Sequence, residues 1–225
     1  MVLKIIPIWC FNCSMFITDN LRSESPYLCQ KCYETLPFID SSICRKCGLS
    51  HKTSECHHEW AESISGFHAI FSYQDPVHKW VNSLKYSQNF FAGKVLQRFV
   101  QQWFENNSDI LEGIDHLLPV PVHLLRLRKR GFNQARYLLN RQKSLPVDSS
   151  ILVKKKQTPQ QAGLSAEERK NHLDGAFEVR KSLEGQGVLV FDDVCTTGQT
   201  VGEISRCLYE AGAARVEVLV VCRTE

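Results

Sequence analysis

The hydrophobic positions of residues 61–225 alternate between two periods. Apolar runs typical of short buried strands occupy residues 67–73, 115–118, 151–153, 187–191 and 216–221. Apolar residues at helical spacing lie between these runs and predict helices at residues 77–84, 91–103, 131–141 and 201–211. Short apolar strands that alternate with helices predict an α/β fold with a parallel, doubly wound sheet.

Residues 1–60 lack this periodicity and hold seven of the ten cysteines. A region of this size buries too little apolar surface to fold without a staple such as a metal ion. Pairs of cysteines with two residues between them, in a chain without an export signal, favour metal ligands over disulfides. We therefore expect two domains, a cysteine module at residues 1–60 and the α/β domain at residues 61–225.

Four of these cysteines have the spacing of a structural zinc site. Cys10 and Cys13 form one pair, Cys29 and Cys32 form another, and fifteen residues separate the pairs. Two cysteines in one tight turn can face the same ion, and two such turns complete a tetrahedron of thiolates around Zn²⁺. Reduced cysteines that bind no metal are the alternative interpretation.

A third pair, Cys44 and Cys47, indicates a second site. Cys56 and either His57 or His58 would complete its set of four ligands, which makes residues 1–60 similar to a double zinc ribbon. The alternative is a degenerate site that has lost its metal. Sites closed by four protein ligands are structural, so we assign catalysis to neither zinc ion.

Composition and charge change this picture little. Apolar residues make up 43% and charged residues 23%, as in ordinary globular proteins, and the net charge of +3 does not by itself indicate nucleic-acid contact. No apolar run reaches the roughly 18 residues of a membrane-spanning helix. The apolar start of the chain lacks the basic segment and cleavage site of a signal peptide. The expected location is cytoplasmic.

The most informative segment is residues 188–200, where an apolar strand ends in two adjacent carboxylates, Asp192 and Asp193. A Thr-Thr-Gly turn and a predicted helix follow. Helix amino termini favour anions, and open α/β sheets bind ligands at the carboxyl ends of their strands. We expect the acids to accept hydrogen bonds from vicinal sugar hydroxyls, and a phosphate to lie on Thr196, Thr197, Gly198 and Thr200. A magnesium site and a plain helix cap are the alternatives for the acids and the threonines.

This segment resembles the thirteen-residue signature with which type I phosphoribosyltransferases bind 5-phosphoribosyl-1-pyrophosphate (PRPP). The order of motifs over nearly the whole chain is similar to that of the ComF family of competence-associated proteins, including its GntX-type members. The motifs that carry this resemblance are the cysteine pairs and residues 84–86, 119–121, 130–134, 158–164, 169–171 and 175–177. The resemblance implies a type I phosphoribosyltransferase-like parallel sheet behind a cysteine-rich zinc module.

The resemblance also implies roles for two loops. Residues 119–122, which include Pro119, Val120 and Pro121, match the pyrophosphate loop, and Arg130 would add a charge-assisted contact. The alternative for Arg130 is a solvated basic start of a helix. Residues 154–166 match a flexible loop that would close over the ligand, with a plain surface linker as the alternative.

Two further side chains have open roles at this stage. Lys85 could reach the ligand site or cap the end of its helix. Cys195 stands inside the signature, but no histidine is placed to activate it, so we interpret it as a packing residue.

One functional hypothesis is an active phosphoribosyltransferase with an unknown acceptor. Mg²⁺ would bridge the ribose hydroxyls and the diphosphate of PRPP, and loss of pyrophosphate would leave an oxocarbenium-like C1 for a nucleophile. Asp192 and Asp193 would hold the ribose and stabilise the positive charge that develops there. Nothing in the sequence identifies the acceptor.

The other hypothesis, which the ComF resemblance favours, is a PRPP-binding protein that assists uptake of single-stranded DNA in natural transformation. Its partners would be single-stranded DNA and a DNA-translocation helicase of the competence system. Stacking surfaces would come from Trp60, Phe67 or Tyr73. The phosphate backbone would follow the basic run Arg126, Arg128, Lys129 and Arg130, for which a solvated face is the alternative.

Overall fold

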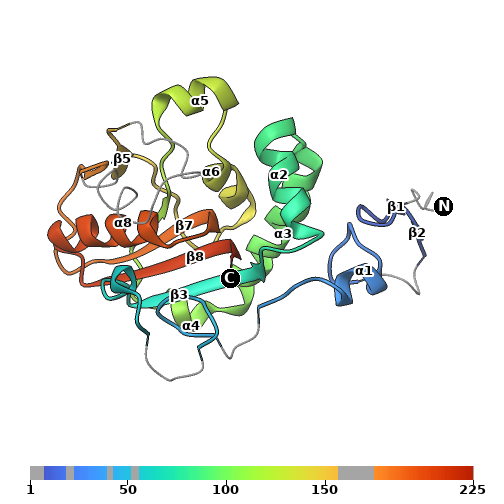
Figure 1. The fold of residues 1–225 in the computed structure, drawn as a ribbon, viewed down its shortest axis with the longest axis horizontal. Helices are drawn as coiled ribbons and strands as arrows, with labels where there is room; N and C mark the ends of the chain where they lie inside the picture. Colours follow the sequence, from blue (N-terminus) through green and yellow to red (C-terminus); the bar gives the residue numbers. More distant parts are fainter. Residues whose placement is uncertain (1–7, 19–22, 40–42, 52–55, 157–174, 225) are drawn as a thin grey trace.

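The computed structural model describes residues 8–18, 23–39, 43–51, 56–156 and 175–224. Its centre is a sheet of four strands (Figure 1). The strands are β3 (Gly66–Ser72), β4 (His116–Pro119), β7 (Gly187–Cys195) and β8 (Arg215–Arg223). All three pairings in the order β3-β8-β7-β4 are parallel. The parallel sheet predicted from the apolar runs is confirmed.

Helices cover both faces of this sheet. α2 (Val77–Ser87), α3 (Phe90–Asn106) and α6 (Gln134–Leu138) pack on the face that includes Leu189 and Phe191. α8 (Gln199–Glu210) packs on the opposite face, which includes Val188 and Val190. Successive residues of one strand thus enter two different cores, as expected for a sheet buried on both sides.

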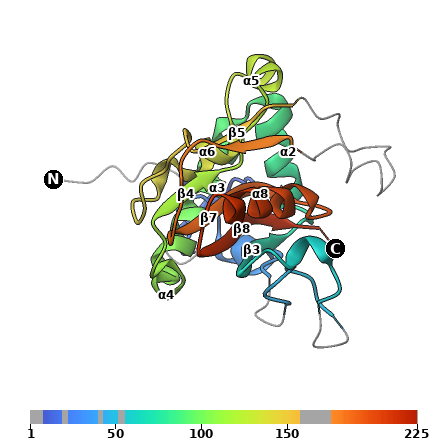
Figure 2. The same ribbon diagram turned by 90° about the vertical axis from the view of Figure 1, so that its left-hand side faces the viewer.

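Short elements connect these layers. They are η2 (Glu59–Ala61), α4 (Ser108–Leu111), α5 (Leu124–Arg130), η3 (Leu139–Arg141), β5 (Leu152–Lys154) and β6 (Phe177–Val179). β5, predicted as a strand, does not join the parallel sheet. It pairs antiparallel with β6 in a separate two-stranded sheet that lies on the same side of the molecule as α5 (Figure 2).

Gly131 ends a helix instead of preceding one. Its φ of 81° is left-handed, which a glycine adopts without a steric penalty, and its N–H closes the last turn of α5 on the carbonyl of Leu127 at 2.7 Å. The basic run of residues 126–130 is therefore helical, and the next helix, α6, starts only at Gln134.

The first cysteine segment lies against α2 and α3. It comprises β1 (Ile8–Trp9), β2 (Phe16–Ile17) and α1 (Gln30–Glu34), at the right of Figure 1. Its Phe11 ring lies 5.7 Å from that of Trp80, and its Cys10, Cys29 and Cys32 belong to the same core as α3. The domain boundary at residue 60 stays a prediction. Within the described ranges, no helix is both long and apolar enough to cross a membrane.

Candidate functional site

The two acids lie within β7, which continues to Cys195, past the predicted end at residue 191. Because side chains alternate along a strand, Asp193 shares the face of Phe191 and α2, whereas Asp192 shares the face of Val190. The backbone N–H of Asp193 donates to Oδ1 of Asp192 at 2.8 Å. Both carboxylates line one cleft at the carboxyl end of the sheet.

Lys85 reaches the acid pair from the last turn of α2. Its Nζ lies 3.0 Å from Oδ1 of Asp193, and the two side chains are only 17% and 10% exposed. Burial alone would lower the pKa of Lys85, but the carboxylates of Asp193 and Asp192 outweigh it and raise that pKa above its ordinary value. Of the two roles that the sequence left open, the structure places Lys85 in the site.

Asp192 is half-buried and carries an altered pKa. Loss of solvent around its carboxyl group, followed by the proximity of Asp193, raises its pKa to about 8, and the ammonium of Lys85 only partly opposes this. Without a ligand, the site therefore holds a proton on this acid near neutral pH.

The cleft has a volume of about 390 Å³ and is rich in cations. Arg126 and Arg130 of α5 and Lys154 of β5 face the same space as the two acids. Burial, followed by the charge of Arg126, lowers the pKa of Lys154 to about 8. The sequence did not single out Lys154 or Arg126 as ligand contacts. The other polar residues of the lining are Lys85, Tyr86, His123, Asn133, Gln134, Thr196 and Thr200.

The predicted pyrophosphate loop forms one wall of this cleft. Val120 donates its N–H to the carbonyl of Phe191 at 2.8 Å, and Asn133 donates to the carbonyl of Val120 at 3.0 Å. Val120 and Pro121 line the cleft, whereas Pro119 is the last residue of β4 and is not part of the lining. The loop is thus fixed between β7 and the start of α6.

Arg130 and Gln134 also line this cleft. The guanidinium of Arg130 lies 5.5 Å from the ring of Tyr86 and donates to Oε1 of Gln134 at 3.5 Å. Gln134 is buried, and no described residue accepts a hydrogen bond from its Nε2. A buried donor beside a cleft is costly unless a ligand or solvent completes it. In the sequence, Gln134 stands out only as part of the motif at residues 130–134.

The predicted phosphate loop joins β7 to α8. Thr196 and Thr200 line the cleft, whereas Thr197 and Gly198 do not. Gly198 has a left-handed φ of 80°, and a Cβ there would lie 2.1 Å from the indole of Trp60. Gly198 thus allows the close approach of Trp60, and its contact with a phosphate stays a prediction.

Cys195 is buried, as expected for a packing residue. Burial raises the pKa of its thiol to about 12, so it remains protonated at neutral pH. Of the predicted flexible loop 154–166, residues 157–166 lie outside the described residues, as do residues 158–164, 169 and 171 of the motifs quoted above.

The basic run divides into two pairs. Arg126 and Arg130 line the cleft, whereas Arg128 and Lys129 are exposed on α5 and stand outside the lining. The expected stacking role of Phe67 does not fit the structure, because its side chain is only 2% exposed.

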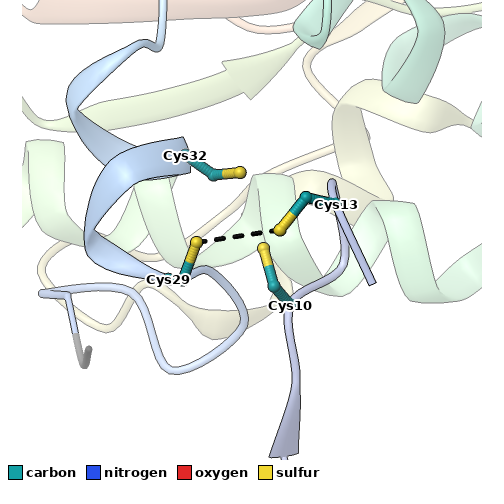
Figure 3. Close-up of side chains that lie close together, drawn as sticks. All are labelled: Cys10, Cys13, Cys29 and Cys32. Atoms are coloured by element: carbon teal, nitrogen blue, oxygen red, sulfur yellow. Dashed lines mark hydrogen bonds between the residues drawn. The ribbon is translucent and has the colours of Figure 1, made fainter. Parts of the chain in front are cut away.

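The side chains of the first cysteine cluster converge as the ligands of a metal site would (Figure 3). The four sulfurs of Cys10, Cys13, Cys29 and Cys32 lie within 4.8 Å of one another, and Cys13 and Cys29 are 3.8 Å apart. Burial opposes ionisation of Cys10, but hydrogen bonds led by the backbone N–H of Cys13 lower its pKa to about 7. Four converging thiols, one of them readily ionised, fit Zn²⁺.

The second cluster contains Cys44, Cys47 and Cys56, as predicted, but its fourth member is His51. The Nε2 atom of His51 lies 2.9 Å from Sγ of Cys47. His58 is not a member of this group. Its ring lies 5.6 Å from that of His51 and 5.9 Å from that of Trp60. The short interval between Cys47 and His51 is the signal that could have identified this ligand. Three thiols and an imidazole also fit Zn²⁺.

The sequence of this chain is similar to those of known proteins. A family model described as the phosphoribosyl transferase domain matches residues 100–225. The DNA utilization protein YhgH of Salmonella typhimurium is 32% identical over 196 residues, which cover 81% of this chain and 85% of that protein. Competence protein F of Haemophilus influenzae is 28% identical, with 95% of this chain and 96% of that protein covered. Competence protein ComFC of Streptococcus pneumoniae is 25% identical, with 90% of each covered.

Proposed function

Because this chain belongs to the phosphoribosyl transferase domain family and is related to the YhgH and ComF proteins, we propose that its cleft binds PRPP or a closely similar sugar phosphate. The observation that carries this proposal is the acid pair Asp192 and Asp193 at the carboxyl end of a parallel strand, facing the start of α8. Such an edge of an α/β sheet is where ligands of this class bind.

The ligand would meet complementary groups on each side. Vicinal sugar hydroxyls would donate to the carboxylates of Asp192 and Asp193. A phosphate would lie at the turn before α8, where Thr196 and Thr200 line the cleft and amide groups begin a helix of twelve residues. The diphosphate would lie along the loop at residues 119–122. Lys85, Arg126, Arg130 and Lys154 would balance its negative charge.

Mg²⁺ is the cation expected with such a ligand. Carboxylate and phosphate oxygens are the donors it prefers, and the acid pair supplies the former. When bound, Mg²⁺ would neutralise charge on the diphosphate. Zn²⁺ would be held by the two cysteine clusters and would serve the fold.

For the role in the cell, we propose assistance to the uptake of single-stranded DNA in natural transformation, in the cytoplasm. The names of the relatives, a DNA utilization protein and competence proteins, support this proposal. Exposed Arg128 and Lys129 on α5 offer charge to a phosphate backbone beside the cleft. A DNA-translocation helicase of the competence system is the partner we propose.

An active phosphoribosyltransferase is the second candidate. The acid pair favours it, because two carboxylates beside C1 of a bound ribose would stabilise positive charge that develops there. The acceptor is unassigned.

Calorimetry with PRPP, with and without Mg²⁺, tests the proposed ligand. We expect wild type to bind and the double variant Asp192→Asn with Asp193→Asn to lose about 1.5–3 kcal/mol for each hydrogen bond to a charged acceptor. Asp109→Asn, on exposed α4, is the matched control and should bind as wild type does. Equal affinity in the double variant and wild type would contradict the assigned role of the acids.

A further inference from the structure

Arg223, the last residue of β8, is a buried cation that no sequence motif indicated. It is only 4% exposed, and none of the ion pairs in the described residues involves it. Its guanidinium instead donates to the carbonyls of Cys47 at 2.9 Å, Cys195 at 3.1 Å and Thr224 at 2.9 Å, and also to that of Thr196. A buried charge is costly unless it is paired or fully hydrogen-bonded, so these carbonyls are its compensation.

Apart from that of the neighbouring Thr224, the carbonyls belong to two segments that are far apart in the sequence. Cys47 is a member of the second cysteine cluster, whereas Cys195 and Thr196 begin the turn that leads into α8. A single side chain therefore joins the candidate metal site to the candidate phosphate loop.

The geometry of the peptide bond gives this contact a consequence for the loop. In a planar trans peptide, the C=O of one residue and the N–H of the next point in opposite directions. A guanidinium that holds the carbonyls of Cys195 and Thr196 thus turns the N–H groups of Thr196 and Thr197 away from itself. Thr196 lines the cleft and Arg223 does not. Arg223 therefore favours the orientation in which these donors are available to an anion.

Trp60 makes a second link between the same two segments. It lies in η2, four residues after Cys56 of the cluster, and its ring is 5.8 Å from the guanidinium of Arg223. A Cβ on Gly198 would lie 2.1 Å from this indole, and one on Gly202 would lie 2.7 Å from Cβ of Trp60. The candidate phosphate loop and the first turn of α8 therefore pack directly against Trp60.

The turn that presents the Cys47 carbonyl depends on the cluster. Gly48 donates its N–H to the carbonyl of Cys44 at 2.8 Å, and Cys44 donates to that of Leu49 at 2.8 Å, which closes a tight knuckle. Four ligand atoms within 4.8 Å of one another hold such a knuckle closed when a cation binds them, because metal binding and local folding are linked.

We propose that a metal ion at Cys44, Cys47, His51 and Cys56 keeps the phosphate loop in its binding shape through Arg223 and Trp60. Occupancy of this cluster then sets the affinity of the cleft for PRPP. This inference rests on the proposed function for its ligand. The first cluster packs against α2 and α3, and no hydrogen bond between described residues joins it to the loop.

The test compares Cys44→Ser with Cys13→Ser. Zinc content, PRPP affinity and hydrogen exchange of residues 194–204 are measured on the full chain. Each variant should lose one of two zinc ions. Only Cys44→Ser should speed exchange in residues 194–204 and weaken PRPP binding, by about tenfold if one or two hydrogen bonds are lost. A wild type with no zinc at the second cluster, or equal exchange in both variants, overturns the proposal.

Arg223→Lys probes the link without replacing any of the four candidate ligands of the cluster. An ammonium cannot span carbonyls on both segments as the planar guanidinium does. We expect this variant to keep two zinc ions, to exchange faster than wild type in residues 194–204 and to bind PRPP more weakly. Unchanged exchange would contradict the role of Arg223. If wild type does not bind PRPP, the proposed function fails, and the exchange data alone decide whether the metal supports the loop.

Discussion

Nζ of Lys85 lies 3.0 Å from Oδ1 of Asp193, although the two residues are far apart in the sequence. Asp193 stands within the segment that the family model matches, residues 100–225, whereas Lys85 precedes it. Helix α2 thus supplies the cation that lets two adjacent carboxylates face one cleft. The site depends on a residue outside the matched segment.

Replacing Lys85 should cost stability, because it leaves Asp193 without its cation in a largely buried position. We expect Lys85→Met to lower the free energy of unfolding by about 3 kcal/mol in urea titrations at pH 7. Lys79→Met on the same helix is the control. Its ion pair with Asp75 is exposed to solvent, so its loss should lower the stability much less than the loss of the Lys85 pair. Equal losses of unfolding free energy in the two variants would contradict a stabilising role of the buried Lys85–Asp193 pair.

The raised pKa of Asp192 predicts a pH dependence of stability. In the unfolded chain this acid loses its proton near pH 3.8, whereas in the fold it keeps it until about pH 8. Its contribution is therefore fully present below pH 4 and is lost as the pH rises toward 8. We expect Asp192→Asn to be more stable than wild type at pH 9, with the difference vanishing near pH 4, in urea titrations.

Asp148→Asn is the control of opposite sign. Hydrogen bonds from the side chain and the backbone N–H of Ser150 lower the pKa of Asp148. This acid stabilises the fold above its ordinary pKa, and that contribution is lost as the pH falls. The variant should be less stable than wild type at pH 7 and approach it in acid. A pH-independent difference for Asp192→Asn would refute its raised pKa.

Loss of one thiolate ligand should remove one metal ion. We expect Cys29→Ser to lower the zinc content from two ions to one and to expose residues 8–39 to protease, because metal binding and folding are linked. Cys207→Ser, outside both clusters, should keep both ions. Metal analysis and limited proteolysis check this. Unchanged zinc in Cys29→Ser would remove the assignment of the first cluster.

The two pairs of basic residues on α5 should affect two different ligands, single-stranded DNA and PRPP. Arg128→Ala with Lys129→Ala should make the log–log salt dependence of single-strand binding shallower by about 1.4, for two phosphate contacts at about 0.7 each. PRPP affinity should remain. Arg126→Ala with Arg130→Ala should weaken PRPP binding, because both residues line the cleft. Fluorescence anisotropy of a labelled oligonucleotide measures the slopes. A wild type that does not bind it at low salt would argue against direct DNA contact.

The patterns with local causes were predictable from the sequence. The apolar run before Asp192 and the turn before α8 are contiguous, so their periods and turn residues sufficed to place a strand, an acid pair and a helix. The pairs of cysteines with two residues between them likewise predicted two clusters, and the structure has both.

The contacts between distant segments were not predictable. Arg223 had no local signal, because its partners lie 176, 28 and 27 positions away at Cys47, Cys195 and Thr196. Trp60 was predicted as a stacking surface for a nucleic-acid base, but its indole packs on Gly198. The apolar run of β5 predicted a strand but not its partner. In the structure β5 pairs with β6 and not with the parallel sheet.

The pairing of β3 with β8 has a consequence for anyone who trims this protein. β3 is hydrogen-bonded along β8 from Gly66 opposite Glu217 to Ser72 opposite Arg223. A fragment that starts at residue 100 would lack β3, and the apolar β8 would become a bare edge strand, open to pairing with other chains. Such a fragment would be expected to aggregate, so the matched family segment should not be treated as an autonomous folding unit.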